Sequence, residues 1–415
     1  MDWTPPERPD WLARFNAEAD AFDVETLVPL QADELIDTAT RSLGITDFGD
    51  DQWREAFQVL ITAINEEAEL NFFGRLFTRA ELLQALKVRL QIQETYRKHP
   101  EIDDEEIREP VFITGLSRSG TSILFERLAE DPQLGPLLSW EIVEPCPPPE
   151  AASYETDPRI ERTDKFLTLY NRLAPQFRAM HEMGARIPNE CSEAFIYSFH
   201  TENLPARVNV PSYLAWLKSH GNWRYMYDYH KRFLKLLQWK NPRRHWLLKA
   251  PPHLWHLDEL FQAFPDARVL YTHRDPLRAN ASNTNLLATL FWMRSDKPFE
   301  TRSFERLLAP EVMADALDSI VGQFEAGDIP IERVINVMYK DLVERPWEAI
   351  DAIYRQTGLE LSTEAERRIR AFIASKQQDK FGRHQYRTVQ DHEERQLREL
   401  FTRYQHYFKV PMEVE

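Results

Sequence analysis

The feature that most constrains the fold is a loop between an apolar segment and a helical pattern. The apolar segment, Val111–Gly115, is rich in strand formers, and the loop reads Gly-Leu-Ser-Arg-Ser-Gly-Thr-Ser over residues 115–122. A loop that leaves a strand and opens a helix directs backbone N–H groups and the positive end of the helix dipole into one small volume, which favours phosphate or sulfate. The segment therefore predicts a strand–loop–helix unit with an anion site, although a connection without a ligand would have the same pattern.

The spacing of this loop matches the nucleotide-binding pattern G-x-x-x-x-G-K-[ST] at every position but one. Thr121 stands where the pattern requires lysine. In nucleoside triphosphatases that lysine reaches the β- and γ-phosphates, and the following hydroxyl helps to hold magnesium. Here the positive charge lies inside the loop, at Arg118, and a guanidinium binds an anion through two parallel hydrogen bonds. The loop therefore suits a 5′-phosphosulfate better than a magnesium-bound triphosphate.

Three further segments, residues 246–249, 268–272 and 334–338, have the composition of buried strands, and helical stretches separate them. This alternation is typical of an α/β protein with a parallel sheet. We therefore expect a three-layer, P-loop-like fold over residues 109–415, with a central parallel sheet flanked by helices and a helical, aromatic-rich insertion around residues 155–240. Residues 1–108 have helical periodicity and predict a helical region packed on the core, with enclosure of a substrate as the alternative role.

A second loop also leaves a predicted strand and begins a helix. Asp275 stands as the N-cap and Pro276 at the first helical position. Arg274 ends the strand, and Arg278 and Ser282 lie one turn apart on one helix face. An arginine and a hydroxyl in this arrangement can bind a second phosphate, although a surface ion pair would have the same local sequence. Two such loops at the carboxyl ends of neighbouring parallel strands favour a shared ligand.

Together these motifs resemble the sulfotransferases that use 3′-phosphoadenosine 5′-phosphosulfate (PAPS), over roughly residues 110–390. The most similar group is bacterial, has an Arg-Ser-Gly-Thr loop and is related in its motifs to protein-tyrosine sulfotransferases. The resemblance implies the sulfotransferase fold and assigns the 3′-phosphate to Arg274 and Ser282. It assigns the 5′-phosphosulfate to the loop residues Arg118, Ser119, Gly120, Thr121 and Ser122.

The same resemblance implies further site residues. Lys249, in Leu-Lys-Ala-Pro, would neutralise charge on the bridging or sulfuryl oxygens, although a strand-end lysine can also reach solvent. Tyr339 would lie against the nucleotide, a position that packing alone explains equally well, and Arg383 belongs to a late basic loop that would close over the cofactor. Glu141 matches the general base of relatives with this loop, with a structural role as the alternative. Competing candidates for the base are Glu144, His253 and His384.

The composition of the chain limits the partners that it can bind and the compartment in which we expect it. The formal net charge of −16 argues against general binding to nucleic acids or anionic membranes. With only two cysteines, Cys146 and Cys191, we expect no disulfide framework. The first residues lack a basic stretch followed by an apolar run, and the longest apolar stretches, such as residues 286–293, are too short to cross a bilayer. These features predict a cytoplasmic protein without a signal peptide or a transmembrane segment.

The predicted reaction is in-line transfer of a sulfuryl group from PAPS to a hydroxyl of a small-molecule, lipid or carbohydrate acceptor, with an amine as the alternative. No metal is expected, because no Cys/His cluster has ligand spacing. The aromatic residues between Phe195 and Trp246 line an acceptor cleft or form the core of a helical subdomain. Two other functions stay open: a P-loop nucleotide kinase or NTPase, and a non-catalytic protein that binds PAPS or its product 3′-phosphoadenosine 5′-phosphate (PAP).

Overall fold

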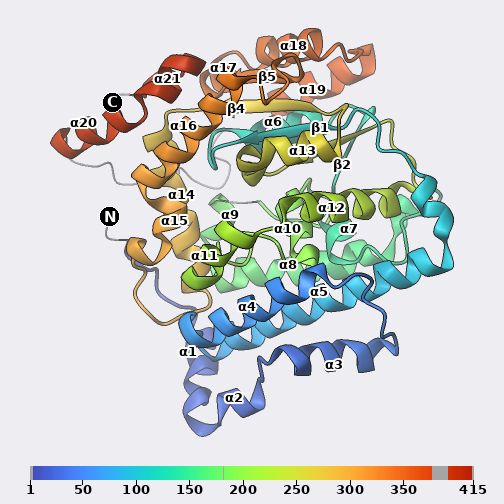
Figure 1. Cartoon of the computed structure of the whole chain (residues 1–415), viewed down its shortest axis with the longest axis vertical. Helices are drawn as coiled ribbons and strands as arrows, with labels where there is room; N and C mark the ends of the chain where they lie inside the picture. The colour runs from blue at the N-terminus through green and yellow to red at the C-terminus, as the bar shows by residue number, and fades with distance from the viewer. Residues whose placement is uncertain (1–2, 181, 376–390, 414–415) are drawn as a thin grey trace.

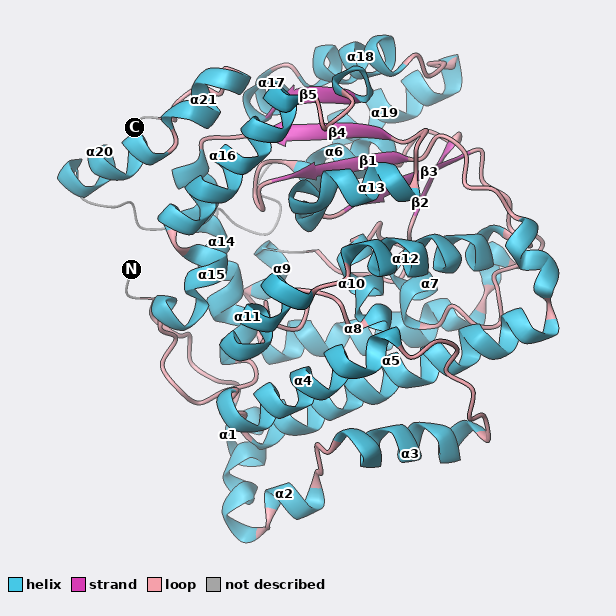
Figure 2. Ribbon diagram, viewed as in Figure 1, coloured by secondary structure: helices cyan, strands magenta, loops and turns pink. Residues whose placement is uncertain are grey.

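The computed structural model describes residues 3–180, 182–375 and 391–413, and its centre is a five-stranded parallel sheet (Figures 1 and 2). The strands are β1 (Val111–Gly115), β2 (Leu134–Pro136), β3 (His245–Lys249), β4 (Arg268–His273) and β5 (Val334–Met338). In space their order is β2-β3-β1-β4-β5. The chain therefore builds one side of β1 first and then crosses to the other, and a crevice at the carboxyl ends of such strands is where α/β proteins bind ligands.

Alternation of side chains along the strands divides the core into two parts. Phe112, Leu248 and Val269 point to one face of the sheet and belong to the largest apolar cluster. Val111 and Leu270 point to the other face and belong to a second cluster. Because successive residues of a strand face opposite sides, a strand buried on both faces must be apolar throughout. The apolar runs that predict β1, β3 and β4 have this physical origin, whereas β5, at the edge of the sheet, exposes Asn336.

Helices cover both faces of the sheet. The second cluster lies under α6 (Thr121–Leu128), α18 (Pro346–Thr357) and α19 (Thr363–Ser375). The largest cluster extends to α12 (Trp223–Gln238), α13 (Leu257–Ala263), α16 (Pro310–Ala326) and α21 (Thr402–Phe408). The prediction of a three-layer α/β fold with a central parallel sheet is confirmed. The sequence pattern does not predict β2, because Leu-Gly-Pro contains two residues that are depleted in strands.

The first hundred residues form helices that lie together at the end of the molecule away from the sheet (Figure 1). They are α1 (Asp10–Ala17), α2 (Val24–Leu27), α3 (Ala32–Leu43), α4 (Gln52–Glu67) and α5 (Phe72–Lys98). Helix α5 is held to later parts of the chain by the Glu81–Arg294 ion pair, at 2.8 Å, and by the backbone hydrogen bond from Asn71 N to the Arg294 carbonyl, at 2.9 Å. The helical N-terminal region is thus packed on the rest of the molecule.

The remaining helices come from the middle and from the carboxyl-terminal part of the chain. They are α7 (Ser139–Val143), α8 (Pro158–Leu173), α9 (Phe177–Met180), α10 (Cys191–Phe195), α11 (Pro211–His220), α14 (Pro276–Trp292), α15 (Glu305–Leu308), α17 (Tyr339–Glu344) and α20 (Asp391–Leu400). The segment between Pro158 and Gln238 is mostly helical. Within the described ranges, every helix is too short or too polar to traverse a bilayer.

Candidate active site

The predicted phosphate loop connects β1 to α6 at the carboxyl end of the sheet. Gly115 has a φ of +145° and Gly120 a φ of +96°, conformations that favour glycine. A Cβ on Gly115 would clash with the Thr272 carbonyl of β4, and one on Gly120 would lie 2.9 Å from the Tyr339 ring. Both glycines therefore let the loop turn tightly and touch its neighbours. The N–H groups at the start of α6 have no helical partners and are available to an anion.

Ser119 and Arg118 have different contacts within this loop. The Ser119 hydroxyl is fully buried, donates to the Leu116 carbonyl at 2.7 Å and lies 2.6 Å from the Thr272 hydroxyl of β4. The side chain of Ser119 therefore fastens the loop to the sheet, and its backbone N–H closes the loop by donating to the Leu116 carbonyl at 3.1 Å. Arg118 has a left-handed backbone, with a φ of +71°, and its Nε donates to the Ser282 hydroxyl at 3.0 Å. This contact brings one residue of each predicted phosphate loop together.

The second loop joins β4 to α14 and lies beside the first. Asp275 caps α14, because its carboxylate accepts a hydrogen bond from Leu277 N at 3.1 Å. The Arg274 guanidinium donates to the Arg118 carbonyl at 3.1 Å and lies 4.2 Å from the centre of the Tyr339 ring. Arg118, Arg274, Ser282 and Tyr339, predicted from separate motifs, are therefore neighbours.

The carboxylate of Glu413 binds two of the three guanidinium nitrogens of Arg274. Nε and one terminal nitrogen of Arg274 donate to its two oxygens at 2.8 and 2.9 Å. Three contacts of the Glu413 backbone hold it there: its N–H donates to Asp275 at 2.8 Å, and its carbonyl accepts from Arg278 at 3.1 Å and from Arg398 at 3.3 Å. A forked pair of this kind is the geometry in which arginine binds carboxylate and phosphate alike.

A buried lysine and a carboxylate face the phosphate loop from the neighbouring strand. Lys249, at the end of β3, has 2% of its surface exposed. Its ammonium lies 2.6 Å from the Glu190 carboxylate and 3.3 Å from the Ser122 hydroxyl of α6. The second oxygen of Glu190 accepts a hydrogen bond from the Ser192 hydroxyl at 3.0 Å. A positive charge and a carboxylate therefore stand together at the loop.

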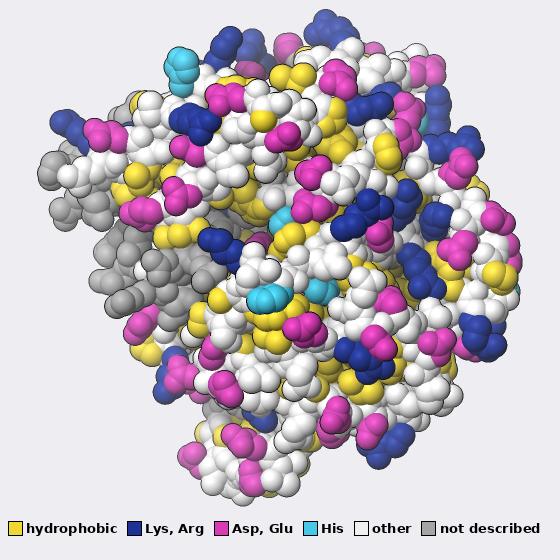
Figure 3. Space-filling model, viewed as in Figure 1, with side chains coloured by type: hydrophobic (Ala, Val, Ile, Leu, Met, Phe, Trp, Pro, Cys, Tyr) yellow, Lys and Arg dark blue, Asp and Glu magenta, His cyan; other side chains and the backbone are white. Residues whose placement is uncertain are grey.

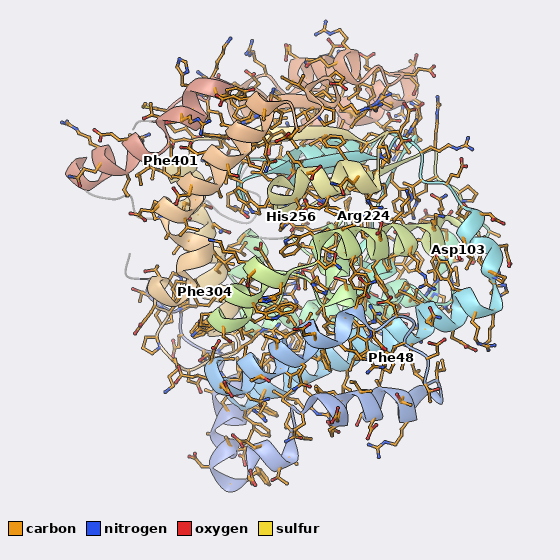
Figure 4. All side chains as sticks on the ribbon, in the orientation of Figure 1. Phe48, Asp103, Arg224, His256, Phe304 and Phe401 are labelled. Carbon is orange, nitrogen blue, oxygen red and sulfur yellow. The ribbon has the colours of Figure 1, made fainter. Side chains whose placement is uncertain are left out.

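A cavity of about 710 Å³ begins at the phosphate loop and extends to α5 and α14. Ser117, Arg118, Thr121 and Ser122 line it, as does Glu190. Its other walls include residues from α8, α10 and α12 and from the short turn after β3. His256, at the end of that turn, lies between the sheet and the helices below it (Figure 4). Anion-binding groups and a large cavity thus meet at one point, an arrangement suited to group transfer.

The model of the sulfotransferase family matches residues 110–364, which hold both predicted phosphate loops. The chain belongs to the sulfotransferase family. Its fold is also similar to that of two solved sulfotransferases. With STF1 from Mycobacterium tuberculosis H37Rv it shares 30% identity and a TM-score of 0.76, over 90% of this chain and 98% of that one. With STF9 from Mycobacterium avium it shares 27% identity and a TM-score of 0.78, over 93% and 98% of the two chains. No curated protein sequence matches it significantly.

The structure of this sulfotransferase-family chain does not bring Glu141, the predicted general base, into the cavity. Its neighbours at positions 142–144 line the cavity, but Glu141 itself has no exposed surface. One carboxylate oxygen is paired with Arg243, and the other accepts a hydrogen bond from Leu138 N at 2.9 Å. Arg243 also contacts the Tyr154 hydroxyl at 3.1 Å. We therefore correct the assignment: the Glu141 carboxylate neutralises the buried Arg243 and accepts a hydrogen bond at the start of α7.

The competing bases have different surroundings. Glu144 lines the cavity, but its carboxylate pairs with Arg162 at 2.6 Å. His253 is fully buried, and its Nδ1 lies 2.8 Å from the Tyr227 hydroxyl. Burial holds the pKa of His253 well below its usual value, so its imidazole is neutral. His384 and the predicted cofactor residue Arg383 lie outside the described residues.

Two residues near the predicted site have no local sequence signal. Glu190 precedes α10, far in the sequence from any strand, and it meets Lys249 only because the helical insertion folds back over β3. Glu413 lies beyond the last helix and reaches Arg274 across 139 positions. For Glu413, the only sequence hint is charge: an arginine at a strand end attracts an acidic partner as readily as a phosphate.

Proposed function

We propose that this sulfotransferase-family chain uses PAPS as the donor and transfers its sulfuryl group to an acceptor hydroxyl. The observation that carries the proposal is the cluster of Arg118, Arg274 and Ser282 at the carboxyl ends of β1 and β4, beside a loop whose lysine position is Thr121. The forked Arg274–Glu413 pair supports the fit, since it demonstrates an anion-binding geometry at that guanidinium. When bound, PAPS would supply the sulfuryl group: an S–O bond forms to the acceptor oxygen as the S–O bond to the 5′-phosphate breaks and PAP leaves.

In this proposal each group of residues has one task. The 5′-phosphosulfate would be held by Arg118, the backbone N–H of Gly120, and the first turn of α6 with Thr121 and Ser122, while Ser119 holds the loop in place. Ser282 and Arg274 would bind the 3′-phosphate, with the Tyr339 ring against the nucleotide. Arg383 stays a prediction, as does the absence of a catalytic metal.

We propose Glu190 as the general base in place of Glu141. Glu190 lines the cavity and its side chain is 23% exposed, so it is open to an acceptor, whereas Glu141 is enclosed. The Glu190 carboxylate would take the proton of the acceptor hydroxyl. Lys249 would hold positive charge beside the loop, where negative charge develops on the leaving phosphate. Their 2.6 Å contact holds the Glu190 carboxylate beside the phosphate loop.

The donor class is tested by calorimetric titration with PAP and, separately, with ATP and magnesium. We expect tight binding of PAP and weak binding of ATP. Arg274→Ala should weaken PAP binding at least about tenfold, because hydrogen bonds between charged groups contribute roughly 1.5–3 kcal/mol. The matched control is Arg355→Ala, whose side chain is 71% exposed on α18 and whose loss should leave PAP binding unchanged. A preference for MgATP would favour the kinase or NTPase alternative and overturn the proposal.

Removal of the Glu413 carboxylate should strengthen PAP binding. A bound phosphate and this carboxylate would compete for the same two guanidinium nitrogens of Arg274. Glu413→Gln removes the competing charge. A partly exposed ion pair contributes about 0.2–1 kcal/mol, which predicts a gain of about 1.4- to fivefold in PAP affinity, largest at low salt. Glu399→Gln on α20 is the control. Unchanged affinity in Glu413→Gln would show that the two anions do not share Arg274.

Partners and location complete the proposal. On the face drawn in Figure 3, acidic and basic side chains are interspersed and no basic stripe is visible, which supports a small-molecule, lipid or carbohydrate acceptor over a nucleic acid. A cytoplasmic location is also proposed. Both Cys146 and Cys191 are free thiols, in agreement with a reducing compartment.

A further inference from the structure

The cavity is much longer than a phosphate loop requires. Along α5 its lining runs from Phe77 to Gln91, a separation of about 21 Å at about 1.5 Å per helical residue. Helix α5 therefore forms one long wall, and the phosphate loop opens onto this space from the opposite side together with Glu190. A molecule that fills the cavity and reaches the loop must be elongated.

One end of the cavity is a cluster of aromatic and aliphatic side chains. Phe77 of α5 packs against Tyr170 of α8, with ring centres 5.5 Å apart, and Phe177 of α9 lies 6.0 Å from Tyr170. Leu286 and Leu290 of α14 pack against the same cluster and line the cavity. Walls of this kind bind apolar surface and offer few hydrogen bonds to a sugar.

Most charges in the lining are already paired with protein groups. Glu81 is bound by Arg207 at 2.8 Å and by Arg294 at 2.8 Å. Glu193 pairs with Arg207 at 2.5 Å. Because these groups satisfy one another, they are not available to the many hydroxyls of a carbohydrate.

Lys87 and Glu202, which also line the cavity, differ from this pattern. Neither Lys87 nor Glu202 has an ion pair within the described part of the chain. Burial alone raises the pKa of the Glu202 carboxyl to about 7, which reflects surroundings that solvate charge poorly. The lining also holds neutral polar side chains, among them Gln91, Asn189 and Asn283, but most of its surface is apolar, and such a lining suits a mostly apolar molecule with a few polar substituents.

We propose that the acceptor is an elongated, mostly apolar alcohol that lies along α5 and presents its hydroxyl to Glu190 and the phosphate loop. This inference rests on the proposed PAPS-dependent transfer. It also assigns a function to the N-terminal helical region: α5 forms a wall of the acceptor site as well as packing on the core.

The test measures transfer from radiolabelled PAPS to three acceptors: decanol, butanol and trehalose. Because each additional buried methylene strengthens binding, kcat/KM should be at least about tenfold higher for decanol than for butanol, and trehalose should be the poorest acceptor. Equal values for the two alcohols, or faster transfer to trehalose, would overturn the inference. Failure to use any of the three while PAP binds tightly would overturn it as well. Absence of PAP binding would instead contradict the proposed function.

Two substitutions on α5 test where the acceptor binds. Ala80 lines the cavity and has an exposed side chain, so Ala80→Trp fills the space without entering the core. It should lower kcat/KM for decanol by about tenfold, with a smaller effect on butanol and with PAP affinity unchanged. Leu76, one turn earlier, is 44% exposed and lies outside the lining. Leu76→Trp is therefore the control, and an equal loss in both variants would contradict the placement of the acceptor along α5.

Discussion

Replacement of Lys249 by methionine is expected to lower kcat about 10²–10³-fold while PAP still binds. Methionine is unbranched and similar in length to lysine but carries no charge. Lys249 has 2% of its surface exposed and lies between Ser122 and Glu190. In the proposed reaction, a buried cation in this place would stabilise the negative charge that develops during transfer, and removal of one such group from a site that excludes water costs a large part of the rate. The measurement is kcat with the alcohol that the wild-type protein uses fastest.

Two controls separate charge from folding. Lys240→Met removes a lysine whose ion pair with Glu150, at 2.9 Å, is exposed, and it should leave kcat unchanged. The double variant Lys249→Met/Glu190→Gln removes both charges of the buried pair, so it leaves no isolated carboxylate and should fold even if the single variant is unstable. If the folded Lys249→Met protein keeps a wild-type kcat, Lys249 has no role in charge stabilisation.

The second large effect is expected when one of two carboxylates, Glu190 or Glu141, is replaced by an amide. Glu190→Gln should lower kcat about 10²–10⁴-fold, because glutamine cannot accept the proton of the acceptor hydroxyl. Glu141→Gln should keep a near-normal kcat but lower the free energy of unfolding by about 3 kcal/mol, because it leaves the buried guanidinium of Arg243 without its counter-charge. Turnover with saturating PAPS and urea unfolding of both proteins distinguish the two roles. The opposite result, with activity lost only in Glu141→Gln, would restore Glu141 as the base.

The sequence by itself determined the fold class and the two loops that hold the proposed donor site. The apolar runs of β1, β3 and β4 reflect burial on both faces of a parallel sheet, and this requirement is local to each strand. The phosphate loop is also a local feature. Gly115 and Gly120 allow its positive φ angles, and its backbone N–H groups need no particular side chain elsewhere.

Only the tertiary structure decided which carboxylate faces the cavity. Glu141 follows the phosphate loop closely in the sequence, yet the packing of Arg243 against it turns its side chain away from the cavity. Glu190 comes from a helical insertion with no motif, and its contact with Lys249 joins residues 59 positions apart. The same holds for Glu413 on Arg274 and for α5 as a wall of the cavity. These relations depend on how separate elements pack together, and no local pattern in the sequence encodes the distance between two elements.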